Sequence, residues 1–377
     1  MKQHIYADNA ATTKLDSEAF EAMLPWLSEE YGNASQPYSF ARKPKKAIAE
    51  ARTVIAACIN ASPDEIFFTS GGTESNNWAI KGSAFSDVDK RATITSKIEH
   101  PSLLNACKRI ETLGYPVAYL PVDGQGVALP STLDEFMSNR TRLVSIMLAN
   151  NEIGTIEPIQ KLAAIAHEYG ALFHTDAVQA VGHVPVDVKL LGVDMLSASA
   201  HKFNGPKGVG FLYIKKGTGI VPFSDGGAQE LGMRAGTENV AAIVGMAVAL
   251  KKNVDCICAN AKHLCSLEDA FIDALSVAKI DYLRNGADDH IPGSISLSIR
   301  GDDGERLLHR LDLMGIYVST GSACDSKNTQ ISHVLQAISL DEDYARGTIR
   351  ISLGKNNTLY DAEQIASALC KILAREN

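Results

Sequence analysis

The residue most suggestive of chemistry is a lysine that directly follows an apolar strand pattern. Lys202 lies in the segment "SASAHKFNGPKG" (residues 197–208), with Ser199 and His201 before it and glycines after it. A lysine in such a place is partly desolvated, loses its proton more easily than a surface lysine, and can attack carbonyl groups. Lys207 is the alternative within this segment, but its position between a proline and a glycine predicts an exposed turn.

Further polar residues follow other predicted strands and are candidates for the same site. Asp176 ends the run "ALFHTDA" (171–177), where a carboxylate needs a cationic partner, although capping of the next helix explains it as well. Gln179 follows three residues later. His100 and Asn151 also come after apolar runs. Taken alone, His100 is better explained as a polar residue near a helix start, and Asn151 as part of a turn.

A glycine pair opens a predicted helix after the run "EIFFTS" (65–70). The residues that follow are Gly71, Gly72 and Thr73. Glycines at a helix start expose backbone N–H groups, and the helix dipole favours an anion such as a phosphate there. An ordinary tight turn between a strand and a helix explains the pair equally well.

Short β-rich runs alternate with helical patterns through most of the chain, and they place these candidates. The expected strands are residues 65–70, 92–96, 141–149, 171–177, 195–200 and 208–216. Runs of near-continuous apolar character with helices between them predict an α/β fold with a mostly parallel sheet covered on both faces. Ligands of such sheets bind beyond the carboxyl ends of the strands, which is where all the candidates above fall.

The pattern changes near residue 250. The helical stretch 237–275 is one long helix or two, and it is followed by strand patterns at 294–300 and 348–354 and by a closing helix. The chain is long enough for two domains of ordinary size. We therefore expect a large domain of residues 15–250 and a smaller α+β domain formed by residues 1–14 and 251–377.

Composition and charge exclude several classes of protein. The 377 residues are 45% hydrophobic and 21% charged, which is typical of soluble globular proteins. The net charge of -8 gives no overall basic surface for nucleic acid. The N-terminus lacks the apolar core of a signal peptide, and no apolar run is long enough to span a bilayer. We expect a cytoplasmic protein that contacts neither membranes nor nucleic acid.

The seven cysteines are an odd number without the spacing of a disulfide framework, so we expect reduced thiols. Cys256, Cys258 and Cys265 lie in a helical pattern without a C-x-x-C pair or a histidine partner, so we expect no metal site. Cys324 differs, because its neighbours in "STGSACDSK" (319–327) are the small and polar residues of a loop. Composition alone is compatible with an ordinary free thiol there.

Together, the candidates supply the parts that a pyridoxal 5'-phosphate site requires. A lysine binds the aldehyde, an acid keeps the pyridine nitrogen protonated, a helix N-terminus with hydroxyl groups binds the phosphate, and a planar group covers the ring. The residues that could fill these roles, in that order, are Lys202, Asp176, Gly72 and Thr73 with Ser199, and His100. A nucleotide-binding enzyme could use such a sheet too, but neither G-x-G-x-x-G nor G-x-x-x-x-G-K-[ST] occurs in the chain.

Nine ordered motifs, spread from about residue 6 to residue 354, resemble those of the cysteine desulfurases, which have the class V aminotransferase fold. They are "DNAATT", "FTSGGTESNN", "SKIEHPSLLNAC", "SIMLANNEIGTIEPI", "HTDAVQAVG", "SASAHKFNGPKGVGFLYI", "MRAGTENV", "STGSACDS" and "IRISLG". The resemblance implies a pyridoxal-phosphate-dependent enzyme of fold type I. Its large domain would hold a mostly parallel seven-stranded sheet flanked by helices, next to a smaller α+β domain.

The resemblance also implies a role for each matching residue. Lys202 would bind the cofactor aldehyde, Asp176 would pair with the pyridine nitrogen, and His100 would stack on the ring and manage protons. Other implied cofactor contacts are Gly72, Thr73, Ser199 and His201 at the phosphate, Asn151 and Gln179 near the ring hydroxyl and the substrate, and Thr237 at the phosphate of a neighbouring subunit. Arg350 would bind the substrate carboxylate as a bidentate partner, with help from Asn33.

The reaction implied by the resemblance removes sulfur from L-cysteine. It releases L-alanine and leaves a persulfide on Cys324, which would pass sulfur to an acceptor such as an iron–sulfur scaffold protein or to thiolation. The implied assembly is a homodimer with composite sites. The chain departs from the family pattern at Tyr38, Asp225 and Ala228 and after Cys324, which concerns the acceptor more than the core chemistry.

Two alternatives to this interpretation are retained from the sequence. One is a selenocysteine lyase or another class V aminotransferase. The other is a non-catalytic sulfur carrier or partner-binding protein. The presence together of Lys202, Asp176, His100, Arg350 and Cys324 argues against the second.

Overall fold

The computed structural model describes residues 4–87, 89–320 and 331–374. Its helices, short 3-10 turns included, are α1 (Ser17–Ser28), η1 (Ser39–Ala41), α2 (Arg42–Cys58), η2 (Pro63–Glu65), α3 (Gly72–Ala84), α4 (Pro101–Glu111), α5 (Pro130–Phe136), α6 (Ile159–Glu168), α7 (Val188–Leu191), η3 (Ala200–Lys202), η4 (Gln229–Gly232), α8 (Val240–Asp255), α9 (Ile257–Val277), α10 (Gly304–Leu313), α11 (His333–Ala337), α12 (Glu342–Ala345) and α13 (Leu359–Ala374). Its strands are β1 (Ile5–Tyr6), β2 (Ile66–Thr69), β3 (Ala92–Ser96), β4 (Val117–Leu120), β5 (Thr141–Ser145), β6 (Leu172–Asp176), β7 (Met195–Ser199), β8 (Gly210–Ile214), β9 (Tyr282–Asn285), β10 (Ser294–Ile299), β11 (Ile316–Tyr317) and β12 (Thr348–Ser352).

The largest sheet has seven strands in the order β2-β8-β7-β6-β5-β3-β4 within the described residues. The pairs β3–β4, β3–β5, β5–β6 and β6–β7 are parallel. Strand β8 runs antiparallel to both of its neighbours, β2 and β7. The predicted α/β fold with a mostly parallel seven-stranded sheet is therefore confirmed.

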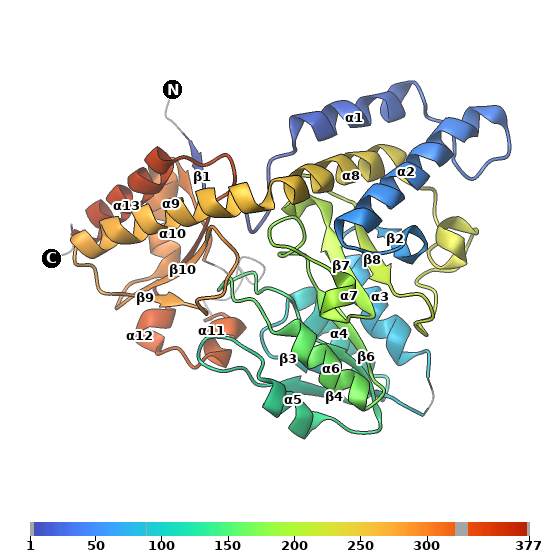
Figure 1. Cartoon of the computed structure of the whole chain (residues 1–377). Coiled ribbons are helices and arrows are strands. Elements are labelled where there is room, and N and C mark those ends of the chain that lie inside the picture. The colour runs from blue at the N-terminus through green and yellow to red at the C-terminus, as the bar shows by residue number, and fades with distance from the viewer. Residues whose placement is uncertain (1–3, 88, 321–330, 375–377) are drawn as a thin grey trace.

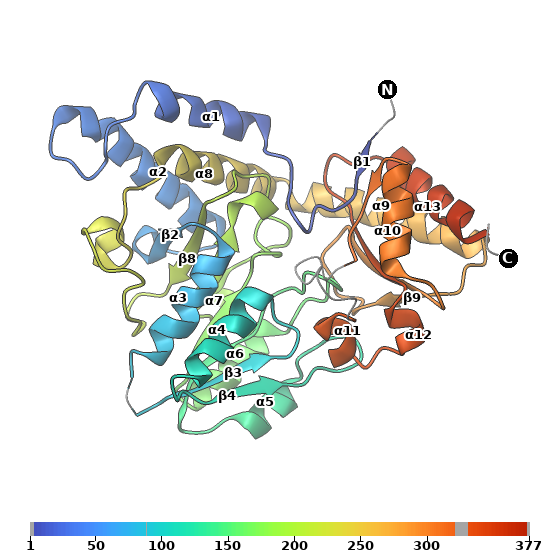
Figure 2. The same cartoon turned by 180° about the vertical axis from the view of Figure 1, so that it is seen from behind.

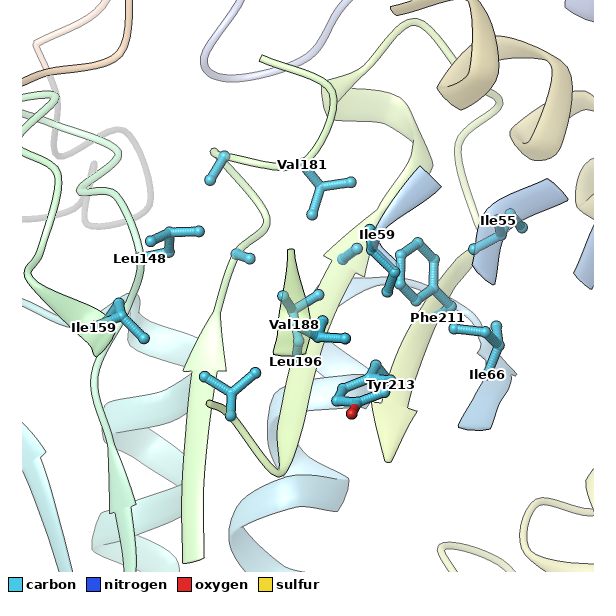
Figure 3. Packing of buried hydrophobic residues seen from close by; sticks show 14 of the residues in the cluster. Ile55, Ile59, Ile66, Leu148, Ile159, Val181, Val188, Leu196, Phe211 and Tyr213 are labelled. Atoms are coloured by element: carbon cyan, nitrogen blue, oxygen red, sulfur yellow. The ribbon is translucent and has the colours of Figure 1, made fainter. Parts of the chain in front are cut away.

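Alternate side chains of the sheet enter two separate apolar layers, because successive residues of a strand point to opposite faces. On β8, Phe211 and Tyr213 join one cluster of buried residues, while Leu212 joins the other. On β5, Val144 and Leu143 divide in the same way. Figure 3 shows the first cluster, in which Phe211 of β8 lies beside Ile55 of α2 and Ile59, the residue that follows α2. Both faces are thus buried, which explains the near-continuous apolar strands of the sequence.

Helices cover both faces of this sheet. Helices α6 and α7 lie in front of it in Figure 1, and α3 and α4 lie in front in the reverse view of Figure 2. Helices α1 and α2 both pack against α8. This layered arrangement directs the loops after the parallel strands to one edge of the sheet, and that edge carries the candidate site.

A second, separate apolar core lies in the C-terminal part of the chain. The antiparallel sheet β12-β10-β9 packs with α9, α10 and α13, and the short parallel pair β1–β11 adds the N-terminal strand. Residues of β1 therefore belong to this core although they begin the chain. We use the name large region for residues 15–250 and the name small region for residues 4–14 and 251–374. The domain boundaries expected from the sequence stay a prediction.

Some elements differ from those expected. The helical stretch 237–275 forms two helices, α8 and α9, which meet at Cys256. The expected strand 141–149 ends at Ser145. Residues 180–192 have a helical pattern, but only the part that forms α7 is a helix. Pro185 explains the second difference, because proline lacks an N–H and disfavours the helical conformation of the residue before it. Strands β4 and β9 were not predicted individually.

Two global properties complete the description. Among residues 4–87, 89–320 and 331–374, no helix combines the length and apolar character needed to cross a membrane. The same residues contain no group of three or more His, Cys, Asp or Glu side chains arranged to hold a metal ion. Cys258 and Cys265 lie exposed on α9.

Candidate functional site

A cavity of about 750 Å³ lies where the ends of several strands of the large sheet face the small region. Strands β2, β3, β5, β6 and β7 each end beside it, as expected for an open α/β sheet. The residues predicted from the sequence that line it are Gly72, Thr73, His100, Asn151, Asp176, Gln179, Ser199, His201, Lys202 and Arg350. The fold therefore brings together side chains that are far apart in the chain.

Lys202 reaches this cavity from the 3-10 turn η3, immediately after β7. Its Nζ donates hydrogen bonds to the carbonyl oxygens of Ala10 and Ala11, the second at 2.9 Å. The side chain is half-buried, so its ammonium group is partly removed from water. Lys207 lies exposed in a turn at the cavity rim, which agrees with the expectation for it.

Asp176 ends β6 and is 4% exposed. Its Oδ2 accepts a hydrogen bond from Asn76 Nδ2 at 2.6 Å, and its Oδ1 accepts one from the Val178 N–H at 3.0 Å. Both carboxylate oxygens are therefore fixed by neutral donors. Asp176 therefore caps the turn that follows β6, in place of the helix cap considered from the sequence, and it also lines the cavity.

The glycine pair at the start of α3 is required by close packing. Gly71 has a φ of 145°, a conformation that favours glycine. A Cβ atom at Gly72 would lie 2.6 Å from Val178 Cγ2, closer than side chains approach one another. The N-terminus of this 13-residue helix consequently opens directly onto the cavity beside Ser199. Its unpaired N–H groups and positive dipole end suit a phosphate.

His100 is the N-cap of α4, which begins at Pro101. Its Nδ1 accepts a hydrogen bond from the Ser102 N–H at 3.1 Å and lies 2.8 Å from Ser102 Oγ. Burial lowers the pKa of its imidazole, although Asp176 nearby acts in the opposite direction. The helix-start explanation is thus correct for Nδ1, while the ring also lines the cavity.

Two other polar side chains tie the N-terminal segment to this edge of the sheet. His201 Nδ1 lies 3.2 Å from Thr12 Oγ1, and Gln179 Nε2 donates to the Ala10 carbonyl at 3.0 Å. Burial, together with the nearby lysines, lowers the pKa of His201 to about 4. His201 is therefore a neutral ring at physiological pH, able to donate a hydrogen bond but only weakly basic.

Arg350 brings a guanidinium from β12 of the small region to the opposite wall. It is 4% exposed, forms an ion pair with Asp8 Oδ1 at 2.7 Å, and donates to the Asn151 carbonyl at 2.8 Å. Its Nε atom is buried and has no hydrogen-bond partner among the described residues. A buried guanidinium with remaining donor capacity is suited to bind a carboxylate.

Two predicted residues among those described do not line the cavity. Asn33 is half-buried and accepts a hydrogen bond from the Ser35 N–H, and Thr237 is exposed in the loop before α8. Ser35 Oγ lies within 3.5 Å of the Glu238 carboxylate, so these two loops are adjacent. Cys324 lies outside the described residues.

Several cavity residues were missed by the sequence analysis. Asn76 lies one helical turn after Gly72 on α3, so its position relative to the glycine pair could have indicated it. Glu152, Ser332 and His333 also line the cavity. Ser332 Oγ donates to Glu152 Oε2 at 2.5 Å, and burial raises the pKa of Glu152. No local pattern indicated this contact between distant segments.

These groups fit pyridoxal 5'-phosphate. The cavity combines an amine, a fixed carboxylate, a glycine-opened helix N-terminus with hydroxyl groups beside it, and an imidazole. These are the partners that the aldehyde, the pyridine nitrogen, the phosphate and the ring of this cofactor require.

Comparison with known proteins agrees with this chemistry. The aminotransferase class-V family model matches residues 5–365. The cysteine desulfurase IscS of Dictyoglomus turgidum is 50% identical over 100% of this chain and 96% of its own length. The protein of the same name from Methanosarcina thermophila is 45% identical over 98% of this chain and 92% of its own length.

Solved structures show the same fold. A NifS-like protein superposes with a TM-score of 0.93 at 38% identity, covering 99% of this chain and all of its own. SspA, solved in complex with cysteine, superposes with a TM-score of 0.83 at 36% identity, covering 94% of this chain and all of its own. The chain therefore belongs to the aminotransferase class-V family and, within it, to the cysteine desulfurases.

Proposed function

We propose that this chain uses pyridoxal 5'-phosphate to remove sulfur from L-cysteine, releasing L-alanine and leaving a persulfide on Cys324. The observation that carries the proposal is the convergence of Lys202, Asp176 and the glycine-opened N-terminus of α3 on one cavity. Membership of the cysteine desulfurases and the cysteine complex of SspA support L-cysteine as the substrate.

The cofactor would be held by residues of the large region. Lys202 would bind its aldehyde and Asp176 its pyridine nitrogen, while Thr73, Ser199 and His201 with the backbone of Gly72 would bind its phosphate. When bound, pyridoxal phosphate supplies an electron sink that stabilises negative charge at the substrate Cα. Asp176 suits its role because both of its oxygens are fixed by hydrogen bonds.

Other side chains would handle the substrate and its protons. Arg350 would bind the substrate carboxylate through its buried guanidinium, with Asn151 and Gln179 close to the reacting atoms. Lys202 would take the Cα proton as general base, a task for which partial burial of its amine is favourable. His100, neutral because burial lowers its pKa, would act from the ring face of the cofactor and take part in the proton transfers.

Cys324 would receive the sulfur. Its thiolate would attack the sulfur of the substrate, because the thiolate is the nucleophilic form of cysteine. The S–S bond forms as the C–S bond breaks, and the carbon that loses sulfur gains a proton to become the methyl group of L-alanine. The persulfide would then serve an acceptor such as an iron–sulfur scaffold protein, or a thiolation pathway.

A homodimer with composite sites is part of this proposal. Thr237 and Asn33 lie on adjacent loops away from the cavity of their own chain, as residues that serve a neighbouring subunit would. Exposed apolar side chains also occur along α1, where Phe20 is 51% and Leu27 is 62% exposed. The cytoplasmic location expected from the sequence remains a prediction.

The direct test supplies the purified protein with pyridoxal phosphate and L-cysteine and measures L-alanine and sulfide together. We expect both products in equal amounts with a reductant present. The Cys324→Ala variant should keep the cofactor absorbance but lose nearly all sulfide release, because only the sulfur acceptor is removed. Cys258→Ala is the matched control, since this thiol is exposed on α9 away from the cavity. Full sulfide release by Cys324→Ala would contradict the role of this cysteine.

A further inference from the structure

Two histidines line the cavity from different regions of the molecule. His100 caps α4 of the large region, and His333 is the first residue of α11 in the small region. The charges of the two rings influence each other, since His333 lowers the pKa of His100. The hydrogen bonds of the two rings differ, and this difference decides which nitrogen of each ring can accept a proton.

The basic nitrogen of His100 is already occupied. A backbone N–H can only donate, so the 3.1 Å contact from Ser102 N requires a lone pair on His100 Nδ1. The neutral ring therefore carries its proton on Nε2. To accept a second proton at Nδ1, His100 would have to give up the cap of α4, so it is set as a hydrogen-bond donor.

The opposite arrangement holds for His333. Its Nε2 lies 3.0 Å from the carbonyl oxygen of Glu99, and a carbonyl can only accept. Nε2 therefore carries the proton and Nδ1 carries the lone pair. Within the described part of the chain, Nδ1 of His333 makes no hydrogen bond. The basic nitrogen of His333, Nδ1, is thus available among the described residues.

The position of the His333 ring is well fixed. The Glu99 side chain is fully buried, and its Oε1 accepts from Ser96 Oγ at 2.7 Å and from the Met147 N–H at 2.9 Å, which holds the carbonyl that His333 contacts. On the other side, Ser332 caps α11 and donates to Glu152. The ring is consequently attached to the large region from two directions.

The other acceptors on the cavity wall are already engaged or are weak bases. Asp176 accepts from Asn76 and Val178, Glu152 accepts from Ser332, and Glu74 is paired with Arg234. His201 is a weak base, because burial lowers its pKa to about 4. His333 Nδ1 remains as an imidazole acceptor that can take a proton without breaking a described hydrogen bond.

We propose that His333 Nδ1 is the proton acceptor for the ammonium group of the incoming amino acid. This inference rests on the proposed function. An amino acid binds as a zwitterion, and its nitrogen becomes a nucleophile only after the ammonium has lost a proton. The N–H bond breaks, the electron pair stays on the nitrogen, and the proton moves to Nδ1. It returns to the amino group when L-alanine leaves, so no other reactant is needed.

Charged groups around the ring favour this transfer. The Glu152 carboxyl interacts with both His333 and Arg350, and the Glu99 carbonyl accepts from Nε2 whether the ring is neutral or protonated. Arg350, which would hold the substrate carboxylate, lines the same cavity. The other cationic or potentially cationic side chains that line the described part of the cavity are His100, His201, Lys202 and Lys207. The site can therefore bind the carboxylate at one point and deprotonate the ammonium at another.

The variant His333→Gln tests the proposal, because its amide can still donate to the Glu99 carbonyl but has no basic nitrogen. The holoenzyme would be mixed with L-alanine, which arrives as an ammonium, or with aminooxyacetate, which has the same carboxylate but a neutral amine. The change in cofactor absorbance would be followed. With L-alanine near neutral pH we expect a loss in rate of about 100-fold, the lower range for general acid–base catalysis. With aminooxyacetate we expect no loss.

The loss with L-alanine should also shrink as the pH rises, because more of the amino acid then arrives as the free amine. His309→Gln is the matched control, since His309 is exposed on α10 and should leave both rates unchanged. Equal slowing with both amines, or no slowing with L-alanine, would overturn the proposal. If the wild type reacts with neither amine, the proposed function itself fails.

A second measurement does not depend on turnover or on a variant. Nitrogen-15 NMR of the histidine rings in the wild-type protein distinguishes a protonated from an unprotonated ring nitrogen. We expect His333 to carry its proton on Nε2 with Nδ1 unprotonated, before any amino acid is added. A proton found on Nδ1 of neutral His333 would contradict the inference.

Discussion

The large and small regions contribute to the cavity in different ways. The large region supplies residues at the carboxyl ends of parallel strands, such as Asp176 at the end of β6 and Lys202 in the 3-10 turn after β7. The small region supplies Arg350 from within a strand and His333 from the start of a short helix. In the proposed function, the first set holds the cofactor and the second set receives the substrate. The comparison suggests that cofactor binding and substrate handling can be altered separately.

One buried titratable group from each region shows two different ways in which such a group is accommodated. In the large region, His174 is fully buried between Ser145 and Ser197, and burial alone lowers its pKa to about 3. In the small region, Glu268 accepts from both Arg284 and His290, and this carboxylate raises the pKa of His290. His174 is thus buried as a neutral group, whereas Glu268 is buried in contact with two basic side chains.

The largest effect is expected from Lys202→Ala in the large region. Loss of the amine removes both the covalent partner of the cofactor and the proposed general base, so desulfuration should fall by about 10⁴-fold or more. Borohydride should no longer fix cofactor mass on the chain. Lys207→Ala, which removes an exposed lysine of the same segment, is the control and should keep the attachment. Cofactor fixed to the Lys202→Ala chain would assign the attachment to another lysine.

A smaller effect of a different kind is expected from Arg350→Lys in the small region. A lysine keeps the charge but not the planar donor pair, so kcat/KM for L-cysteine should fall by about 30-fold, or about 2 kcal/mol of a charged hydrogen bond. Cofactor absorbance should not change. Arg300→Lys is the control, since this guanidinium is 60% exposed in a surface ion pair. If Arg350→Lys instead lost the cofactor absorbance and left the KM for L-cysteine unchanged, the proposed division of roles would be wrong. In that division the large region holds the cofactor and the small region receives the substrate.

The sequence could predict the large region's share of the site because simple local rules apply there. An apolar run followed by a polar residue locates a strand end, and the ends of parallel strands meet at one edge. Strand β3 spans the predicted residues 92–96, and β6 and β7 end within one residue of the predicted limits. His100, Asp176 and Lys202 follow these strands and line the same cavity.

The small region's share could not be predicted in this way. Ser332 and Glu152 are 180 residues apart, and their contact arises only when the two cores pack together. Asp8 and Arg350 are 342 residues apart, and their contact forms only when the N-terminal segment joins the rest of the small region. His333 follows no strand, and its tautomer depends on a backbone carbonyl in another region. Arg350 itself was indicated only by resemblance to a family.

The smallest expected effects, when taken per pH unit, concern the pH dependence of stability, and they use two buried groups of the large region. His174 has a folded-state pKa of about 3, below the ordinary value of 6.5. As the pH falls from 6.5, the unfolded chain binds a proton that the folded chain does not. His174 should therefore lower the free energy of unfolding by about 1.4 kcal/mol per pH unit over this range.

Glu157 should act with the opposite sign. Burial raises its pKa from 4.5 to about 8, so the folded chain keeps a proton that the unfolded chain releases between these values. Its contribution to the free energy of unfolding should therefore fall as the pH rises from 4.5 towards 8, again by about 1.4 kcal/mol per pH unit. The variants are His174→Gln and Glu157→Gln. The free energy of unfolding of each variant is measured by urea unfolding across the pH range, and the value of the wild type at the same pH is subtracted. Relative to the wild type, His174→Gln should gain stability on acidification and Glu157→Gln on alkalinisation.

The variant His309→Gln of the small region provides the reference, because His309 is exposed on α10. The difference in the free energy of unfolding between His309→Gln and the wild type should not vary with pH. If His174→Gln and Glu157→Gln also showed differences that are constant with pH, these two groups would not be buried in their neutral forms. The contrast between His174 and Glu157, buried as neutral groups, and Glu268, buried in an ion pair, would then have to be abandoned.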